Sequence, residues 1–87
     1  MSFRVFTVAT SERGMDRIAS VEKFAAPLGG QEIELQQVDY EAGGMSLLRI
    51  RIRERSRFTV FDIDPGTALR WGKAMLRWAE EQGQTEF

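Results

Sequence analysis

Five arginines lie close together in the second half of the chain, and their spacing could support the binding of anions. Arg49, Arg51 and Arg53 alternate with apolar residues, so a strand would place all three on one face of a sheet. Guanidinium groups at this spacing can follow a phosphate backbone and stack on bases. The pattern predicts a site for anions or single-stranded nucleic acid at Arg49, Arg51, Arg53 and Arg57, with Arg55 in the adjoining turn.

The same arginines also have a simpler interpretation as a solvated face. They can pair across neighbouring strands with Glu32, Glu34 or Glu41. The chain has 12 basic and 13 acidic residues, so its formal charge of -1 gives no general attraction for polyanions. The pattern shows no aromatic residues interleaved with the arginines on that face, although Tyr40 or Phe58 could stack on bases if they are exposed. We therefore favour the paired surface and treat nucleic acid as a less favoured partner.

Two groups of acidic residues are candidates for metal binding or acid–base chemistry. Asp62 and Asp64 lie two residues apart at the end of a strand and could share a divalent cation. Asp64 is also placed to cap the following helix, which explains it without a metal. Asp39, Tyr40 and Glu41 combine carboxylates with a phenol, but no nucleophile lies beside them. A carboxylate-based metal protein or enzyme remains an alternative, and we assign no metal or catalytic residue.

The chain contains no cysteine and no histidine. Thiolate metal sites, disulfides and cysteine nucleophiles are therefore excluded, and so are the usual general base and the commonest metal ligand. This composition argues against an enzyme, and we expect no cofactor. The lack of cysteine also fits a reducing compartment.

The clearest structural element is a C-terminal helix. Asp64 is placed as its N-cap and Pro65 as its first residue, while Gly83 suits a left-handed C-cap after Gln82. Gly72 lies in the apolar face, which predicts a close approach of the helix to the sheet at that point. One face of the helix carries Ala68, Trp71, Gly72, Met75, Trp78 and Ala79, flanked by Leu69 and Leu76. Trp71 and Trp78 could mark a ligand pocket, but large residues at helical spacing more often belong to a core.

Four strand-like segments precede this helix, at 21–26, 33–40, 48–53 and 57–63. They predict an α+β fold, in which a four-stranded antiparallel meander is followed by one amphipathic C-terminal helix. The phase of the apolar residues changes at Gln36–Gln37, which predicts a bulge or bend there. Residues 54–56 are expected to form a three-residue hairpin connection.

The whole chain, 1–87, is expected to form one domain with its core at 20–83 and an N-terminal extension over 1–19. An apolar segment at Phe3–Val8 predicts an extra strand in that extension. No apolar run approaches the roughly 20 residues that span a bilayer, and the first ten residues do not resemble a signal peptide. We therefore expect no membrane partner and a cytoplasmic location.

The strand at 57–63 carries apolar residues in both phases, with Phe58 and Val60 in one and Phe61 and Ile63 in the other. This pattern predicts a strand that is covered on both faces. A single helix covers only one face, so either the N-terminal segment or a second copy must cover the other. Because a small domain gains most from association, we expect self-association into a homodimer.

The stretch from Leu47 to Ala79, with its L-L-R-x-x-I-R-E, R-F-T-x-x-D, D-P and W-A elements, resembles a group of small uncharacterised bacterial proteins of unknown function. That resemblance implies no activity and no functional residues. The order of four antiparallel strands and a helix is also similar to the half-unit of the Whirly, purine-rich-element-binding and transcriptional-coactivator families. Those families dimerise and bind single-stranded nucleic acid on the sheet, but their binding residues do not map onto this sequence. The working hypothesis is a small non-enzymatic binding or interaction domain.

Overall fold

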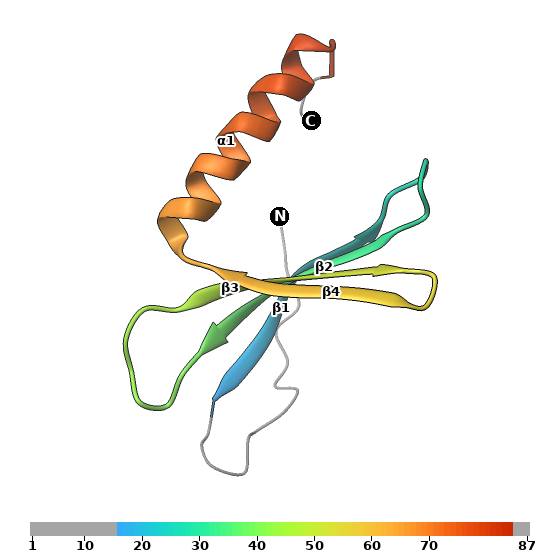
Figure 1. Cartoon of the computed structure of the whole chain (residues 1–87). Helices are drawn as coiled ribbons and strands as arrows, with labels where there is room; N and C mark the ends of the chain where they lie inside the picture. Colours follow the sequence, from blue (N-terminus) through green and yellow to red (C-terminus); the bar gives the residue numbers. More distant parts are fainter. Residues whose placement is uncertain (1–15, 85–87) are drawn as a thin grey trace.

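The computed structural model describes residues 16–84, which form one antiparallel sheet and one helix (Figure 1). The strands are β1 (Arg17–Ala25), β2 (Glu32–Asp39), β3 (Leu47–Glu54) and β4 (Arg57–Ile63), and the helix is α1 (Pro65–Glu81). The strands lie in the order β1-β2-β3-β4, each antiparallel to its neighbour. The predicted meander with a C-terminal helix is therefore confirmed. The strand expected at Phe3–Val8 lies outside the described residues.

The first two strands differ from the prediction in their details. β1 begins at Arg17, not at Val21, and its pairing with β2 shifts between Ser20 and Glu22. β2 pairs with β3 in a regular register from Glu32 to Val38, so the bulge predicted at Gln36–Gln37 is absent. The irregularity lies in an edge strand, where an extra residue disturbs only one ladder. β2 has neighbours on both sides, and its apolar residues serve both faces of the sheet.

The connection between β3 and β4 is one residue shorter than expected. Glu54 pairs with Arg57, so only Arg55 and Ser56 form the turn, and Arg55 takes a positive φ of 60°. A three-residue connection would have set Arg57 opposite Arg53. Because side chains alternate along a strand, this change of one residue moves Arg57 to the other face.

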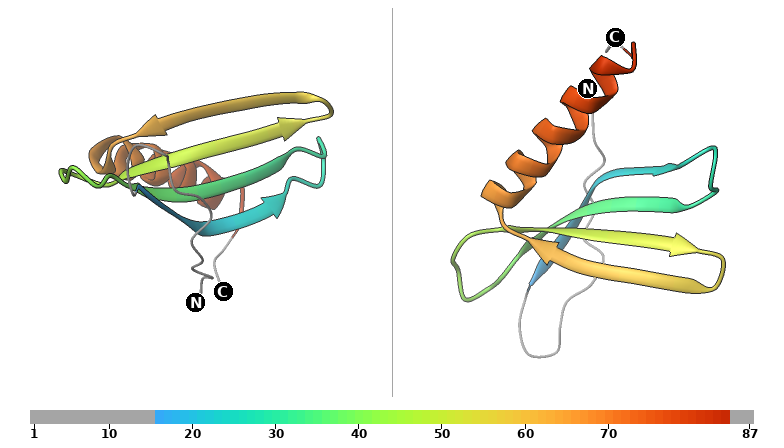
Figure 2. Two further views of the ribbon diagram at one scale, coloured as in Figure 1. Left: turned by 90° about the horizontal axis from the view of Figure 1, so that it is seen from below. Right: turned by 45° about the horizontal axis from the view of Figure 1, so that its top comes forward.

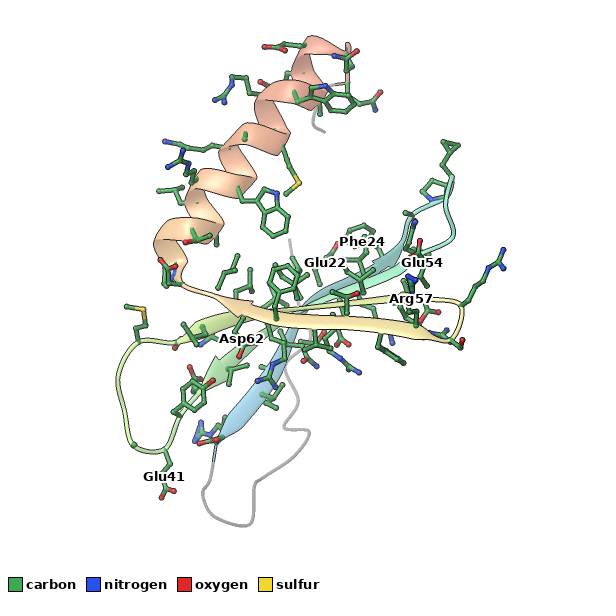
Figure 3. The ribbon with its side chains drawn as sticks, viewed as in Figure 1. Glu22, Phe24, Glu41, Glu54, Arg57 and Asp62 are labelled. Carbon is green, nitrogen blue, oxygen red and sulfur yellow. The ribbon has the colours of Figure 1, made fainter. Side chains whose placement is uncertain are left out.

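The register divides the sheet into two chemically different faces. The face toward α1, called here the helix-side face, carries Phe24, Ile33, Leu35, Leu48, Ile50, Ile52, Phe61 and Ile63. The opposite face, called the arginine face, carries Glu32, Glu34, Val38, Arg49, Arg51, Arg53, Phe58, Val60 and Asp62. In Figure 3, Phe24 is drawn on the side of the sheet that α1 faces, and Asp62 on the other side.

The N-terminus of α1 is fixed as the sequence predicts. Asp64 is the N-cap, its Oδ2 accepts the Thr67 N–H at 3.1 Å, and Pro65 occupies the first turn. Gln82 is the C-cap and Gly83 takes a φ of 90°, so the helix ends one residue before the predicted position. A single residue therefore separates β4 from α1.

The helix does not lie flat on the sheet. It rises away from it after the first turns, as two views show (Figures 1 and 2), and none of its residues is buried. A Cβ atom added at Gly72 would meet nothing within 4 Å. The close approach predicted at Gly72 is therefore wrong for the helix and its own sheet.

Few apolar side chains are buried in the described part of the chain. Among residues 16–84, only Val38, at 2% exposure, and Ile50, at 5%, are buried hydrophobic residues. β4 is an edge strand, and Phe58, Val60 and Phe61 are all exposed. The prediction that β4 is covered on both faces is wrong for the described part of one chain, because α1 rises away from one face and no described element packs on the other.

Candidate functional site

The three arginines of β3 form an ion-paired ladder across the arginine face. The Arg49 guanidinium donates to both carboxylate oxygens of Asp62, at 2.8 and 3.1 Å. On the opposite side of β3, Arg51 lies 3.5 Å from Glu34 and Arg53 lies 2.9 Å from Glu32. These six residues are called the arginine ladder. Each member pairs with the residue directly opposite it in the sheet register.

This pairing bears directly on the predicted anion site. Glu32 and Glu34 are partners that the sequence suggested, whereas the third partner is Asp62 and not Glu41. Each guanidinium of the ladder therefore already has a carboxylate, and the six charges sum to zero. Arg57 lies on the helix-side face beside Glu54, so the four candidate arginines are not brought together. The geometry favours the solvated, paired surface over a nucleic-acid site.

One aromatic residue was misplaced by the sequence interpretation. The register sets Phe58 opposite Arg53 on the arginine face, and the Arg51 guanidinium lies 5.6 Å from the centre of its ring. The expectation that aromatic residues are absent from this face is therefore wrong. The face of Phe58 could have been predicted from a two-residue turn, because the length of the turn fixes which residues of β4 share a face with the arginines of β3. Phe58 borders a shallow hollow of about 140 Å³, whose other lining side chains include Lys23, Glu32, Glu34, Arg51 and Arg53. This lining mixes both charges.

The two carboxylates proposed for a metal each have another partner. Asp62 binds Arg49 and accepts a hydrogen bond from Tyr40, and these contacts lower its pKa, with the Arg49 hydrogen bond as the largest cause. Asp64 accepts hydrogen bonds from the Thr67 side chain and backbone, which lower its pKa. No cluster of three metal-binding side chains occurs within the described residues. The structure therefore gives both aspartates structural roles at the junction of β4 and α1.

The acidic group at the end of β2 is also divided among different partners. Asp39 accepts hydrogen bonds from the Ser46 hydroxyl and from the Gln37 amide, and these contacts lower its pKa, the Ser46 bond being the largest cause. Tyr40 contacts Asp62, and the backbone N–H of Glu41 donates to Asp16 at 3.0 Å. These three residues are therefore not assembled into an acid–base site.

The ladder predicts a loss of stability in acid. Because the pKa of Asp62 is lower in the folded chain than in the unfolded chain, its contribution is present above about pH 4 and is lost as the pH falls through the folded value. Urea denaturation between pH 7 and pH 2.5 should therefore show a smaller pH dependence for Asp62→Asn than for the parent. Glu80→Gln, which removes a carboxylate outside the ladder, is the matched control. Equal slopes for Asp62→Asn and the parent would contradict this assignment.

Several large apolar side chains of α1 and the sheet are exposed in the part of the chain that the structure describes. Trp71 of α1 stacks on Phe61 of β4, with ring centres 6.1 Å apart and an interplanar angle of 29°. Beyond this contact, α1 and the sheet face each other with exposed side chains. The apolar surface is defined here as Phe24 and Phe61 of the sheet with Leu69, Trp71, Met75, Leu76 and Trp78 of the helix. The sequence identified the helical residues but expected them to be covered by the chain's own sheet.

The fold and its surfaces define a small α+β domain with a self-neutralised charged face and an open apolar surface. The family of unknown function DUF6967 matches residues 15–81, which is most of the chain, and the chain belongs to this family. The match confirms the resemblance to proteins of unknown function seen between Leu47 and Ala79. No curated protein and no solved structure matches the chain. Within the described part, the single helix is neither long nor apolar enough to cross a membrane.

Proposed function

We propose that this protein is a non-enzymatic interaction domain that acts as a homodimer, with the apolar surface as its contact with the second copy. The observation that carries the proposal is the exposure of large apolar side chains on α1. Trp78 is 64% exposed and Met75 53%, although both lie on the face that the amphipathic pattern assigns to a core. A second copy would supply the cover that one chain lacks.

The size of the apolar surface supports a stable dimer. The exposed parts of its seven side chains come to about 700 Å² per chain, if a free side chain of this size exposes about 200 Å². Two copies would therefore bury about 1,400 Å², within the range of about 1,200–2,000 Å² found for specific interfaces. Aromatic residues and methionine, which are enriched at such interfaces, supply most of this area.

The small number of buried apolar side chains also favours a dimer. A small domain buries a limited share of its surface, and the described part of this one has two buried apolar side chains. Association of folded chains stabilises them by mass action, so a dimer adds the burial that the isolated chain lacks. The proposal includes no catalysis, because the sequence has no histidine or cysteine and the candidate aspartates have structural partners. The cytoplasmic location remains a prediction of the sequence.

Sedimentation velocity of the full chain between 1 and 200 µM tests the proposal. We expect the mass of a dimer at the upper concentrations. The emission of Trp71 and Trp78, the only tryptophans, should shift to longer wavelength on dilution as the dimer dissociates. A monomer at every concentration would refute the homodimer and would mean that another part of the chain or another protein covers the apolar surface.

A further inference from the structure

We infer that the two copies exchange the C-terminal halves of their helices, so that Met75 and Trp78 of each chain pack on the helix-side face of the partner's sheet near Phe24. This inference rests on the proposed homodimer and adds the mode of contact. Three observations support it. The later turns of α1 are exposed beyond the contact of Trp71 with its own sheet, the junction before α1 is short, and there is free space beside Gly72.

Along the middle of the apolar face, exposure increases from Trp71 through Met75 to Trp78, while Leu69, at the flank of this face near the start of α1, is 61% exposed. Trp71 is 40% exposed and is stacked on Phe61 of its own sheet. Met75, one turn later, is 53% exposed, and Trp78 is 64% exposed. The first turns of the helix therefore belong to the chain's own sheet, whereas the later turns leave it. Figure 1 shows the same divergence between α1 and the sheet.

The helix-side face of the sheet also has exposed apolar residues. Phe61, beside the start of α1, is 38% exposed, whereas Phe24 on the distant edge strand β1 is 46% exposed. Within residues 16–84, each chain therefore has an exposed apolar helix end and an exposed apolar sheet region. A two-fold axis brings the helix end of one copy to the sheet region of the other, and the reverse, in a single closed arrangement.

The junction before α1 is short and limits how far the helix can turn toward its own sheet. β4 and α1 are separated by Asp64 alone, and the Thr67 hydroxyl and N–H bind its carboxylate at 2.5 and 3.1 Å. Pro65 restricts the next backbone angle. Directly before the junction, Asp62 is held by Arg49 through two hydrogen bonds. Because one residue joins β4 to α1, few backbone angles are available for turning the helix toward its own sheet.

Gly72 is consistent with a close contact from outside the chain. It lies in the apolar face of α1, where a glycine weakens a helix relative to alanine. Its own sheet does not require the small residue, because an added Cβ would meet nothing within 4 Å. In the exchanged dimer, Gly72 leaves room for the backbone of the partner helix where the two helices cross.

The absence of cysteine allows a direct test with single thiols. Glu22 is exposed on β1, and it is drawn beside Phe24 in Figure 3. Ala79 lies on the apolar face of α1 and Arg77 on the opposite, charged face. A Glu22→Cys chain carrying a size tag is mixed with an untagged Ala79→Cys chain, treated with a short bismaleimide and analysed on a denaturing gel. The same mixture with Arg77→Cys is the matched control.

We expect a crosslinked heterodimer from the Glu22→Cys and Ala79→Cys mixture, with a yield at least tenfold above that of the Arg77→Cys mixture. Crosslinks confined to pairs of Ala79→Cys chains would show helix-to-helix packing and would overturn the exchange. No crosslink from a sample that sediments as a dimer would also overturn it, while the homodimer itself would stand. A monomer would refute both. If Ala79→Cys does not fold by circular dichroism, Gln82→Cys replaces it.

Discussion

Replacing Met75 with Glu should convert the dimer into a monomer at low micromolar concentration. Met75 lies near the middle of the apolar face of α1 and is 53% exposed in the single chain. In the dimer, a carboxylate at this position would lose its hydration without gaining a partner. We expect a cost of about 3 kcal/mol, which raises the dissociation constant about 100-fold. Sedimentation velocity over a dilution series measures this change.

Arg77→Gln is the matched control for this substitution. It lowers the net charge of the same helix by the same one unit, at a position on the opposite, charged face. We expect the dissociation constant of Arg77→Gln to stay within about threefold of the parent, as for a residue outside an interface. Similar weakening by both substitutions would indicate that net charge, and not the apolar surface, controls association.

The sequence predicted the order of elements because their signals are local. The cap at Asp64, the proline after it and the glycine at position 83 define α1 within one residue. Alternation of apolar and charged residues likewise defines β3. The arginine ladder was predicted in part, since Glu32 and Glu34 lie on a neighbouring strand. Such features depend on spacing along the chain, which a sequence displays directly.

Features that depend on register or on angles between elements could not be predicted in the same way. The partner of Arg49 is Asp62, and the face of Arg57 is opposite to that of Arg53, because the hairpin turn has two residues and not three. The alternation pattern is the same for both turn lengths. The amphipathic pattern of α1 does not predict the direction of the helix relative to the sheet. It predicts that one face is buried, but not whether the chain's own sheet or another molecule buries it.

Within the core of the sheet, truncation of Ile50 should cause the largest loss of stability. This residue lies on central strand β3, is 5% exposed, and is flanked on the helix-side face by Leu35 of β2 and Phe61 of β4. Truncation to alanine removes apolar contacts and leaves a cavity that the paired strands on both sides cannot close. The free energy of unfolding of a domain is about 5–15 kcal/mol, so losing one central side chain removes a large share of it.

We therefore expect Ile50→Ala to lower the free energy of unfolding by about 3 kcal/mol, measured by urea denaturation at one fixed protein concentration. Val60→Ala on edge strand β4 is the control, because Val60 is 50% exposed and its truncation should cost about 0.5 kcal/mol. The comparison separates a buried residue of a central strand from an exposed residue on the arginine face. Equal losses would mean that Val60 is buried in solution as deeply as Ile50, which places a partner on the arginine face and contradicts helix exchange as the main contact.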